Sequence, residues 1–314
     1  MVLNRCRKNS QLSDEEYARW RDLVHQRIGL NIKENQLEFL GIRLRKRMDQ
    51  LTIPTYGEYY NFVTEGCQNG HEWQQLMELL VNRESSFFRH LPSFNALMDN
   101  IFPEFAKNRL ERGDRLISMW SAGCSRGQEA HSMAMCFAQV FGDQENCELR
   151  ITGTDISRNA LARAQKGEYS FFETRNMPRL FKERYMMQIG MSGGSERLET
   201  QDDRPLAKHD HLYRVKDNIR KKIRFGLLNL NNSTDYWISM QDVIFCQNVL
   251  IYFSVQDRAR VIFMLLKVLR PGGYLFLAPG DALHVKIEGA TCERFKDALA
   301  YKRNEEAVHV RIVK

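Results

Sequence analysis

The spacing of apolar residues divides the chain into two parts with different predicted architectures. Between residues 13 and 82, apolar side chains recur at helical spacing, and no strand-like alternation interrupts them. From residue 115 onward, short apolar runs alternate with helical stretches, which is typical of βαβ units around a parallel sheet. The pattern therefore predicts an all-α domain, placed at residues 1–88, and an α/β domain, placed at residues 89–314.

The N-terminal part carries clear signals for helix boundaries. Ser13 and Glu16 form a capping box, and Gly29 follows the last apolar position of the first stripe. Pro54 ends the second stripe, and Thr55 begins a third helix. The residues expected to face the core are Tyr17, Trp20, Val24 and Ile28 in the first helix, Leu37, Leu40, Leu44, Met48 and Leu51 in the second, and Trp73, Leu76 and Leu80 in a fourth.

The C-terminal part alternates between predicted strands and predicted helices. Strands are expected at 116–120, 149–154, 243–246 and 274–277, and helices at about 128–141, 157–166 and 255–270. The sequence Arg-Pro-Gly-Gly at 270–273 is expected to end the last helix and turn the chain into a strand. Residues 168–222 break the alternation just before a strand-like run at 223–228. They are predicted to form an inserted small β-subdomain, with a long loop as the alternative.

The first predicted strand leads into a turn that contains two glycines. Gly123 and Gly127 have the spacing G-x-x-x-G, which differs from the G-x-G-x-x-G fingerprint of dinucleotide-binding proteins. Glu129 begins the next helix, and Asp155 ends the second strand, where a carboxylate can accept hydrogen bonds from a ribose. This frame suits S-adenosylmethionine, which presents an ammonium, a sulfonium and a ribose but no phosphate. Taken singly, either acid is equally well explained as favouring a helix dipole.

Composition narrows the class of protein. Hydrophobic residues make up 43% of the chain and charged residues 27%, as in ordinary globular proteins. No apolar run approaches the roughly 20 residues that cross a bilayer, and the N-terminus lacks the apolar core of a secretory signal, so we expect a soluble, cytoplasmic protein without membrane insertion. The seven cysteines are scattered and never spaced C-x-x-C, which argues against disulfides and against a metal site.

Longer motifs surround the glycine turn. They are NRESSFFRH at 82–90, IFCQNVLIYF at 244–253 and LRPGGYLFL at 269–277. Together with the turn and the helical part, they make nearly the whole chain resemble the CheR family of chemotaxis methyltransferases. The resemblance implies an α/β, Rossmann-like class I methyltransferase domain with an inserted small β-subdomain, preceded by an all-α domain. It also implies that glutamates of methyl-accepting chemoreceptors are esterified, in chemotaxis or pilus-motility signalling, with S-adenosylmethionine as donor and S-adenosylhomocysteine as product.

The resemblance also implies roles for individual residues. Implied cofactor contacts are Ser85, Arg89, Glu129, Asp155, Asn229, Leu230, Gln247 and Asn248, and we add Gly123 from the turn and Arg83, which stands where the family commonly has Asn. Arg89 and Tyr252 are implied in the catalytic pocket. The planar guanidinium of Arg89 matches the geometry of a carboxylate, whereas Tyr252 suits core packing equally well. Phe87 and Phe88 are expected to pack in the core rather than to contact adenine.

A run of basic residues in the helical part indicates a binding surface for an acidic partner. The chain has a formal net charge of +7, and residues 43–47 read RLRKR. The candidates for partner binding are Arg43, Arg45, Lys46 and Arg47. They would complement the cytoplasmic domains of chemoreceptors, whose methylation regions are acidic helical bundles as the resemblance implies. A solvated helix face is the alternative, and we expect the protein to be a monomer.

Two other functions fit part of the sequence. Departures from the family pattern at Gln128, Ala130, His131 and Gln247 would suit a non-catalytic, receptor-docking module that binds S-adenosylmethionine. The positive charge would suit a nucleic-acid methyltransferase, but residues 247–250 lack the prolines of the motif that amine-modifying enzymes carry, so no nucleic-acid partner is expected. A glutamate, with an ordinary pKa of about 4.3, is ionised at neutral pH, so esterification needs no general base.

Overall fold

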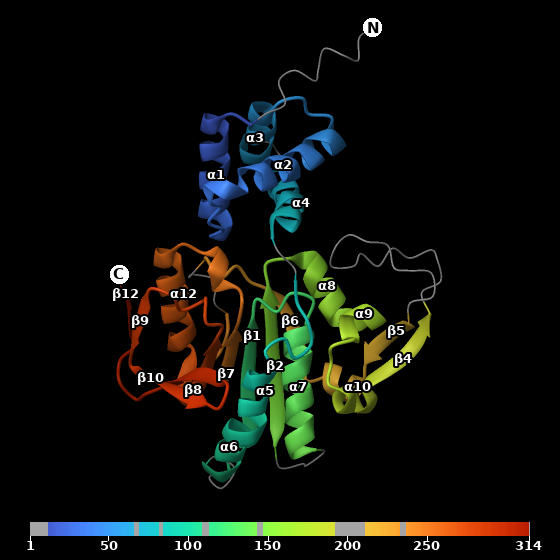
Figure 1. The fold of residues 1–314 in the computed structure, drawn as a ribbon, viewed down its shortest axis with the longest axis vertical. Helices are drawn as coiled ribbons and strands as arrows, with labels where there is room; N and C mark the ends of the chain where they lie inside the picture. Colours follow the sequence, from blue (N-terminus) through green and yellow to red (C-terminus); the bar gives the residue numbers. More distant parts are fainter. Residues whose placement is uncertain are drawn as a thin grey trace. The chain divides into compact units, whose positions relative to one another are not determined.

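The computed structural model describes residues 12–65, 69–81, 84–108, 113–142, 147–191, 211–232 and 237–313. Contacts within the chain define two compact units (Figure 1). One unit contains Met1–Asn82 and Tyr252–Asp257, and the other contains Arg83–Ile251 and Arg258–Lys314. None of the described helices is long and apolar enough to span a membrane.

The first unit is built from helices. They are α1 (Asp14–Ile28), α2 (Leu37–Leu51), α3 (Tyr56–Glu65) and α4 (Asn69–Leu80), with a 3₁₀ turn at Glu34–Gln36. The predicted capping box is confirmed, because the Ser13 hydroxyl accepts a hydrogen bond from the Glu16 amide while the Glu16 carboxylate accepts one from the Ser13 amide. Trp20 is buried and packs on Tyr59, with 5.2 Å between ring centroids. The predicted apolar stripe of α2 is buried at Leu40, Leu44 and Met48.

A segment from far along the chain completes this unit. Phe253 forms an antiparallel bridge with Leu30, and the amide of Asn31 donates a hydrogen bond to the Tyr252 carbonyl, 2.8 Å away. Residues 252–257 are therefore held by backbone contacts to the chain that follows α1. The sequence pattern did not indicate this, since the contact depends on two segments about 220 residues apart.

The second unit is organised around a mainly parallel sheet. Its strands are β1 (Leu116–Ala122), β2 (Glu148–Asp155), β6 (Ile223–Leu227), β7 (Gln241–Cys246), β8 (Leu269–Leu277), β10 (Ala290–Phe295) and β11 (Ala298–Arg303). The strand order is β10-β11-β8-β7-β1-β2-β6. Pairing is parallel from β8 to β6 and antiparallel at β11 and β10. The predicted α/β class is confirmed, but the strand-like run at 223–228, which the sequence placed at the edge of the insertion, belongs to the main sheet.

Helices cover this sheet. They are α5 (Leu91–Ala96), α6 (Phe102–Asn108), α7 (Gln128–Phe141), α8 (Arg158–Lys166), α11 (Asp217–Arg220) and α12 (Val255–Lys267). A π-helical turn, Leu97–Ile101, joins α5 to α6. In Figure 1, α5 and α7 lie in front of the central strands, and α6 lies below α5. Aromatic side chains connect α5 to the sheet, because Phe94 of α5 stacks on Phe245 of β7, with 5.3 Å between ring centroids. Phe87 and Phe88 belong to the same core, which confirms their predicted packing role.

The insertion folds as a small antiparallel sheet. Its strands are β3 (Glu168–Ser170), β4 (Met186–Met191) and β5 (His211–Val215), in the order β3-β5-β4, with helices α9 (Phe171–Thr174) and α10 (Arg179–Tyr185). The prediction of an inserted β-subdomain is therefore confirmed for the part of 168–222 that the structure describes. A further antiparallel pair joins β9 (Val285–Glu288) to β12 (His309–Ile312) near the C-terminal end of the chain.

Two boundaries differ from the sequence-based expectations. Helix α12 ends at Lys267, and the predicted Arg-Pro-Gly-Gly turn at 270–273 already lies within β8. A Cβ on Gly273 would lie 2.8 Å from the Asp242 carbonyl oxygen, so close pairing with β7 requires glycine there. The second unit begins at Arg83, six residues before residue 89, where the α/β domain was expected to start.

Candidate functional site

The carboxyl ends of the parallel strands bring most of the predicted cofactor residues to one edge of the sheet. The glycine turn follows β1, Asp155 ends β2, Asn229 follows β6, and Gln247 follows β7. Strand β1 lies between β2 and β7, so the strand order reverses at β1. In open parallel sheets, ligands bind at the carboxyl ends of the strands where the strand order reverses. The sheet topology therefore places the candidate site at the carboxyl end of β1.

The glycine turn is shaped by close packing. Gly123 and Gly127 have φ angles of 79° and 85°, which favour glycine. A Cβ on Gly123 would lie 2.6 Å from Val249 Cγ2, and a Cβ on Gly127 would lie 2.8 Å from the Ala164 Cβ. The amide of Gly123 donates to the Thr154 carbonyl at 2.8 Å, which ties the turn to β2. Neither position can carry a side chain without moving its neighbours.

Glu129 lies in the first turn of α7 and is the main acidic group of the site. The Ser121 hydroxyl donates to its Oε1 at 2.7 Å. Burial is the main reason that the pKa of Glu129 is raised to about 7. The negative charge of Asp281 raises this pKa as well. The hydrogen bond from Ser121 and the positive charge of Arg89 both lower it. Part of the side chain stays accessible. A cationic ligand beside it would stabilise the ionised form, so Glu129 is suited to hold an ammonium or a sulfonium.

Asp155 organises the turn from the neighbouring strand. Its Oδ2 accepts a hydrogen bond from the Ser125 amide at 2.8 Å, and its Oδ1 accepts one from the Ser157 amide at 2.9 Å. A carboxylate accepts hydrogen bonds at about four positions, so it is the kind of group that suits the hydroxyl donors of a ribose. Asp155 thus links the glycine turn to the start of α8, and its contact with a ribose stays a prediction.

The remaining strand ends contribute amides and an apolar surface. Asn229 Oδ1 accepts from the Asn231 amide at 2.9 Å, and Leu230 is buried beside it. Across the sheet, Gln247 Nε2 donates to the Ser93 hydroxyl at 3.1 Å. Asn248 follows with a positive φ of 60°, a conformation that Asn tolerates better than most residues.

Arg89 belongs to the same charged surroundings, because it lowers the pKa of Glu129. Its side chain is exposed, and Nη1 donates to the Glu84 carbonyl at 3.1 Å. Phe88 before it has a φ of 52°, and its amide donates to the Ser132 hydroxyl at 3.1 Å. A bulky residue in this region is strained, and the burial of its ring holds it there. Ser85 lies half-buried in the same segment.

For two predicted site residues, Arg83 and Tyr252, the contacts given above do not link them to Glu129, Asp155 or the glycine turn. Arg83 lies outside the described residues. Tyr252 belongs to the helical unit, where its carbonyl accepts the bond from Asn31. The catalytic role of Tyr252 and the cofactor role of Arg83 therefore stay predictions.

Sequence reasoning missed Asp281. Its side chain is completely buried after β8, and it accepts backbone hydrogen bonds from Asn248 and Ile251, 2.7 and 3.0 Å away. The signal in the sequence was only an acidic residue shortly after the strand that contains Pro-Gly-Gly. Only the strand pairing of β7 with β8 places this carboxylate beside the loop that carries Gln247.

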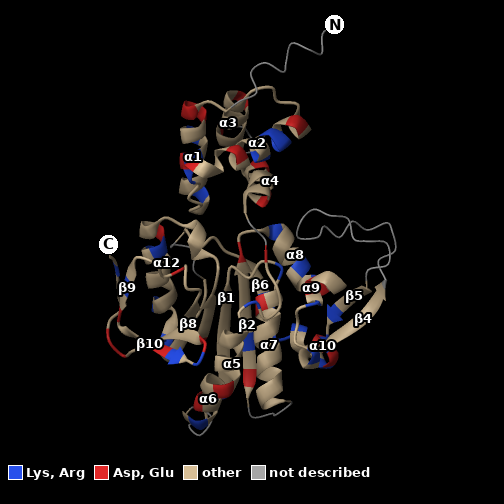
Figure 2. Ribbon diagram, in the orientation of Figure 1, with Lys and Arg blue, Asp and Glu red and all other residues tan. Residues whose placement is uncertain are grey.

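The basic side chains of the run on α2, blue in Figure 2, lie in different environments. Arg47 donates to the buried carboxylate of Glu72 at 2.9 Å, and Arg45 donates to the Tyr56 hydroxyl at 3.1 Å. The Arg43 guanidinium lies 5.2 Å from the centroid of the Phe39 ring. Lys46, like Arg45, is exposed. Arg47 therefore contributes to the fold of the helical unit, and the exposed surface of the run comes mainly from the other three residues.

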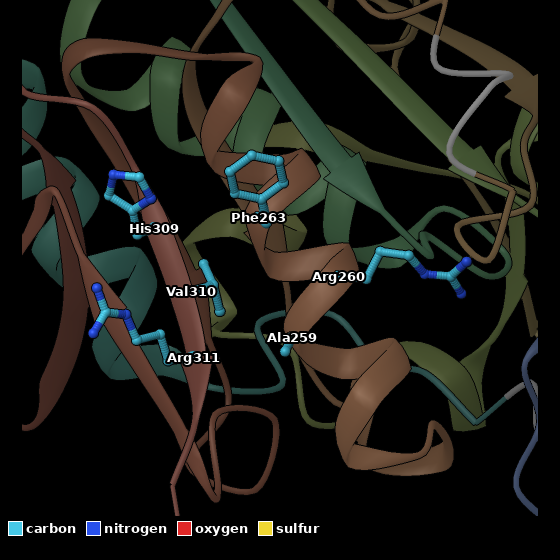
Figure 3. Close-up of a pocket in the computed structure, with 6 residues that line it drawn as sticks. All are labelled: Ala259, Arg260, Phe263, His309, Val310 and Arg311. Atoms are coloured by element: carbon cyan, nitrogen blue, oxygen red, sulfur yellow. The ribbon is translucent and has the colours of Figure 1, made fainter.

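A shallow pocket of about 360 Å³ lies elsewhere, between α12 and β12 (Figure 3). It is lined by Ala259, Arg260, Phe263, His309, Val310 and Arg311. Arg311 pairs with Glu288 at 3.4 Å, and Arg260 donates to Asn231. None of the predicted cofactor residues lines this pocket, so it is separate from the candidate site.

The donor set at the carboxyl edge fits S-adenosylmethionine. Glu129 and Asp155 supply acceptors for an ammonium and a ribose. Within the described residues, no group of three or more His, Cys, Asp or Glu side chains could hold a metal ion. The residues present therefore match a cationic, phosphate-free ligand.

Comparisons with known proteins agree with this geometry. Residues 83–295 match the family model described as CheR methyltransferase, SAM binding domain, and residues 15–81 match CheR methyltransferase, all-alpha domain. Chemotaxis protein methyltransferase Cher2 of Pseudomonas putida is 30% identical over 86% of this chain and 90% of its own length. Chemotaxis protein methyltransferase 2 of Vibrio cholerae is 25% identical over 92% of this chain and 93% of its own. The chain belongs to the CheR methyltransferase family, and its cofactor is S-adenosylmethionine.

Proposed function

We propose that the protein is a protein-glutamate O-methyltransferase that acts on the cytoplasmic domains of methyl-accepting chemoreceptors. The observation that carries the proposal is the gathering of Glu129, Asp155 and the glycine turn at the carboxyl edge of the sheet, in a chain whose relatives are named chemotaxis protein methyltransferases. The surroundings of Glu129 suit the donor, and the guanidinium of Arg89 suits a carboxylate acceptor. In this proposal the protein works as a cytoplasmic monomer in chemotaxis or pilus-motility signalling.

The chemistry requires positioning rather than acid–base catalysis. The acceptor carboxylate attacks the methyl carbon, a C–O bond forms as the S–C bond breaks, and the sulfur keeps the electron pair as a thioether. Negative acceptor and positive donor become neutral products, so removal of water from both reactants favours the transition state. Arg89 orients the acceptor, and Ser121 and Glu129 fix the donor.

The helical unit is proposed to recognise the receptor. On α2, Phe39 and Ile42 are 37% and 55% exposed, and Arg43 and Lys46 follow them at helical spacing, so apolar and basic side chains share one face. Such a face complements an acidic, amphipathic helical bundle, because charge steers the encounter and apolar contacts hold it. Arg45 adds to the exposed charge, whereas Arg47 is committed to Glu72.

Label transfer tests the proposal directly. The protein is incubated with methyl-labelled S-adenosylmethionine and receptor-rich membranes, and methanol released by base is counted. We expect base-labile label on the receptor band. Label in nucleic acid, or no transfer by a protein that binds the cofactor, would contradict the proposal and favour one of the two alternative functions.

Arg89→Ala tests the orienting residue. We expect the turnover to fall at least about 100-fold while the affinity for S-adenosylhomocysteine changes less than about threefold, because the group acts on the acceptor. Arg150→Ala is the matched control, since Arg150 is an exposed arginine in β2 whose described ion pair is with Glu148 at 3.8 Å. An equal loss of turnover and of cofactor affinity would make Arg89 a cofactor-binding residue only.

A further inference from the structure

A buried carboxylate joins the carboxyl ends of β7 and β8. Asp281 is fully buried, and its own amide donates to the Ala278 carbonyl at 2.9 Å while the Ala278 amide donates back to Asp281 Oδ2 at 3.1 Å. These two bonds close the turn that follows β8. Hydrogen bonds within its own turn therefore fix the position of the Asp281 side chain, independently of its contacts with other loops.

The same carboxylate fixes the loop that follows β7. Oδ2 accepts a hydrogen bond from the Asn248 amide at 2.7 Å, and Oδ1 accepts one from the Ile251 amide at 3.0 Å. Asn248 has a φ of 60°, so the loop turns sharply through a conformation that costs most L residues energy. Hydrogen bonds from amides to an ionised group are among the strong ones, and here they hold the strained turn.

This loop is the one expected to touch the cofactor. Gln247 and Asn248 are the predicted contacts, and Val249 packs so tightly on the glycine turn that no Cβ fits on Gly123. The side chain of Val249 and the backbone of Gly123 must move together. A shift of the loop would therefore be transmitted to the turn between β1 and α7.

Asp281 also acts on the donor-binding acid through its charge. Its carboxylate raises the pKa of Glu129, which shows that the two acids lie within electrostatic reach of each other. Burial raises the pKa of Asp281 itself, and the backbone amides that donate to it oppose this effect. Two neighbouring carboxylates at one strand edge favour a ligand that carries positive charge.

We propose that Asp281 is a positioning residue for methyl transfer, which holds the Asn248–Ile251 turn and thereby places the cofactor-contacting loop against the glycine turn. The proposal rests on the proposed site residues Gln247 and Asn248. Asp281 does not touch the reacting atoms and acts through the loop.

Asp281→Asn is the first test. The amide keeps the size of the side chain but replaces one acceptor with a donor that faces a backbone N–H. We expect the dissociation constant for S-adenosylhomocysteine, measured by calorimetry, to rise about tenfold, and the turnover with receptor membranes to fall about 10- to 100-fold, since a displacement near 1 Å has this effect. Hydrogen exchange at the amides of Asn248 and Ile251 should become faster.

Asp242→Asn is the matched control. Asp242 is also buried, accepts a hydrogen bond from the Ser118 amide at 2.7 Å, and lies at the amino end of β7, opposite the site. We expect it to lower the melting temperature about as much as Asp281→Asn, with cofactor affinity within twofold of wild type. Equal losses of affinity in the two variants, or none in either, would overturn the proposal.

Asp281→Glu separates position from charge and serves if Asp281→Asn does not fold. It keeps the buried charge but moves the carboxylate by one methylene. We expect turnover to fall about tenfold or more; turnover at the wild-type level would overturn the proposal. The calorimetric comparison needs no methyl acceptor, so it decides the role of Asp281 even if receptors prove not to be the substrate.

Discussion

The raised pKa of Glu129 predicts that cofactor binding depends on pH. Burial raises this pKa to about 7 in the protein without ligand, and only the ionised form attracts a cation. The dissociation constant then rises by a factor of 1 + 10^(pKa − pH), which is about 11 at pH 6.0 and about 1.3 at pH 7.5. We therefore expect S-adenosylmethionine to bind about eightfold more weakly at pH 6.0 than at pH 7.5.

Calorimetry between these pH values tests the reasoning. The upper limit matters because an α-amino group has a pKa of about 7.7–8.0, so the ammonium of the ligand loses its charge at higher pH. Glu129→Gln keeps the shape of the side chain and the bond from Ser121 but cannot titrate. We expect this variant to bind weakly and with the same affinity at both pH values. A wild-type affinity that does not change, or a variant that keeps the full pH dependence, would refute the reasoning.

The same group has an opposite effect on the stability of the ligand-free protein. Folding raises the pKa of Glu129 from 4.5 to about 7, so the folded state favours the protonated carboxyl. Protonation of Glu129 therefore stabilises the folded protein fully below about pH 4.5, and this contribution is lost as the pH rises toward 7. The full change corresponds to about 3 kcal/mol. Urea unfolding at pH 8 should therefore show Glu129→Gln to be more stable than wild type, whereas the variant should gain less from added cofactor.

Three further substitutions test the packing and the surface. Gly123→Ala combines a φ of 79° with a Cβ 2.6 Å from Val249 and should weaken cofactor binding at least tenfold, measured by calorimetry; unchanged affinity would contradict the packing argument. Arg47→Ala leaves Glu72 buried without this partner and should lower the unfolding free energy by about 3 kcal/mol in urea titrations. Lys46→Ala should leave stability unchanged but slow receptor methylation at low salt; equal rates would exclude Lys46 from the receptor-binding face.

The sequence predicted those parts of the fold that depend on local signals. The capping box at Ser13 and the bounds of α7 are determined by neighbours within one or two turns, and the structure has both as expected. Strand β6 was found by its pattern at the edge of the insertion, but its place in the main sheet was not, because the periodicity of 223–228 carries no information about its partner β2. The same limit explains why the pairing of Leu30 with Phe253 was missed.

The candidate site was predictable for a different reason. Gly123, Glu129 and Asp155 lie next to predicted strand ends, and the carboxyl ends of parallel strands meet at one edge, so their proximity followed from the topology. Asp281 could not be found in this way. Its importance depends on hydrogen bonds to the backbone of another loop, and backbone donors leave no trace in the sequence.

One departure from the family pattern, His131, belongs to a buried network that joins the glycine turn to the insertion. The carboxylate of Glu173 in α9 accepts a hydrogen bond from Arg126 at 3.0 Å, and both side chains are almost fully buried. Tyr169 donates to the Arg126 carbonyl at 2.6 Å and lies 3.1 Å from Nδ1 of His131, whose pKa burial lowers to about 4. His131 is therefore neutral and structural. These contacts bind the cofactor turn to the insertion through Arg126 and His131.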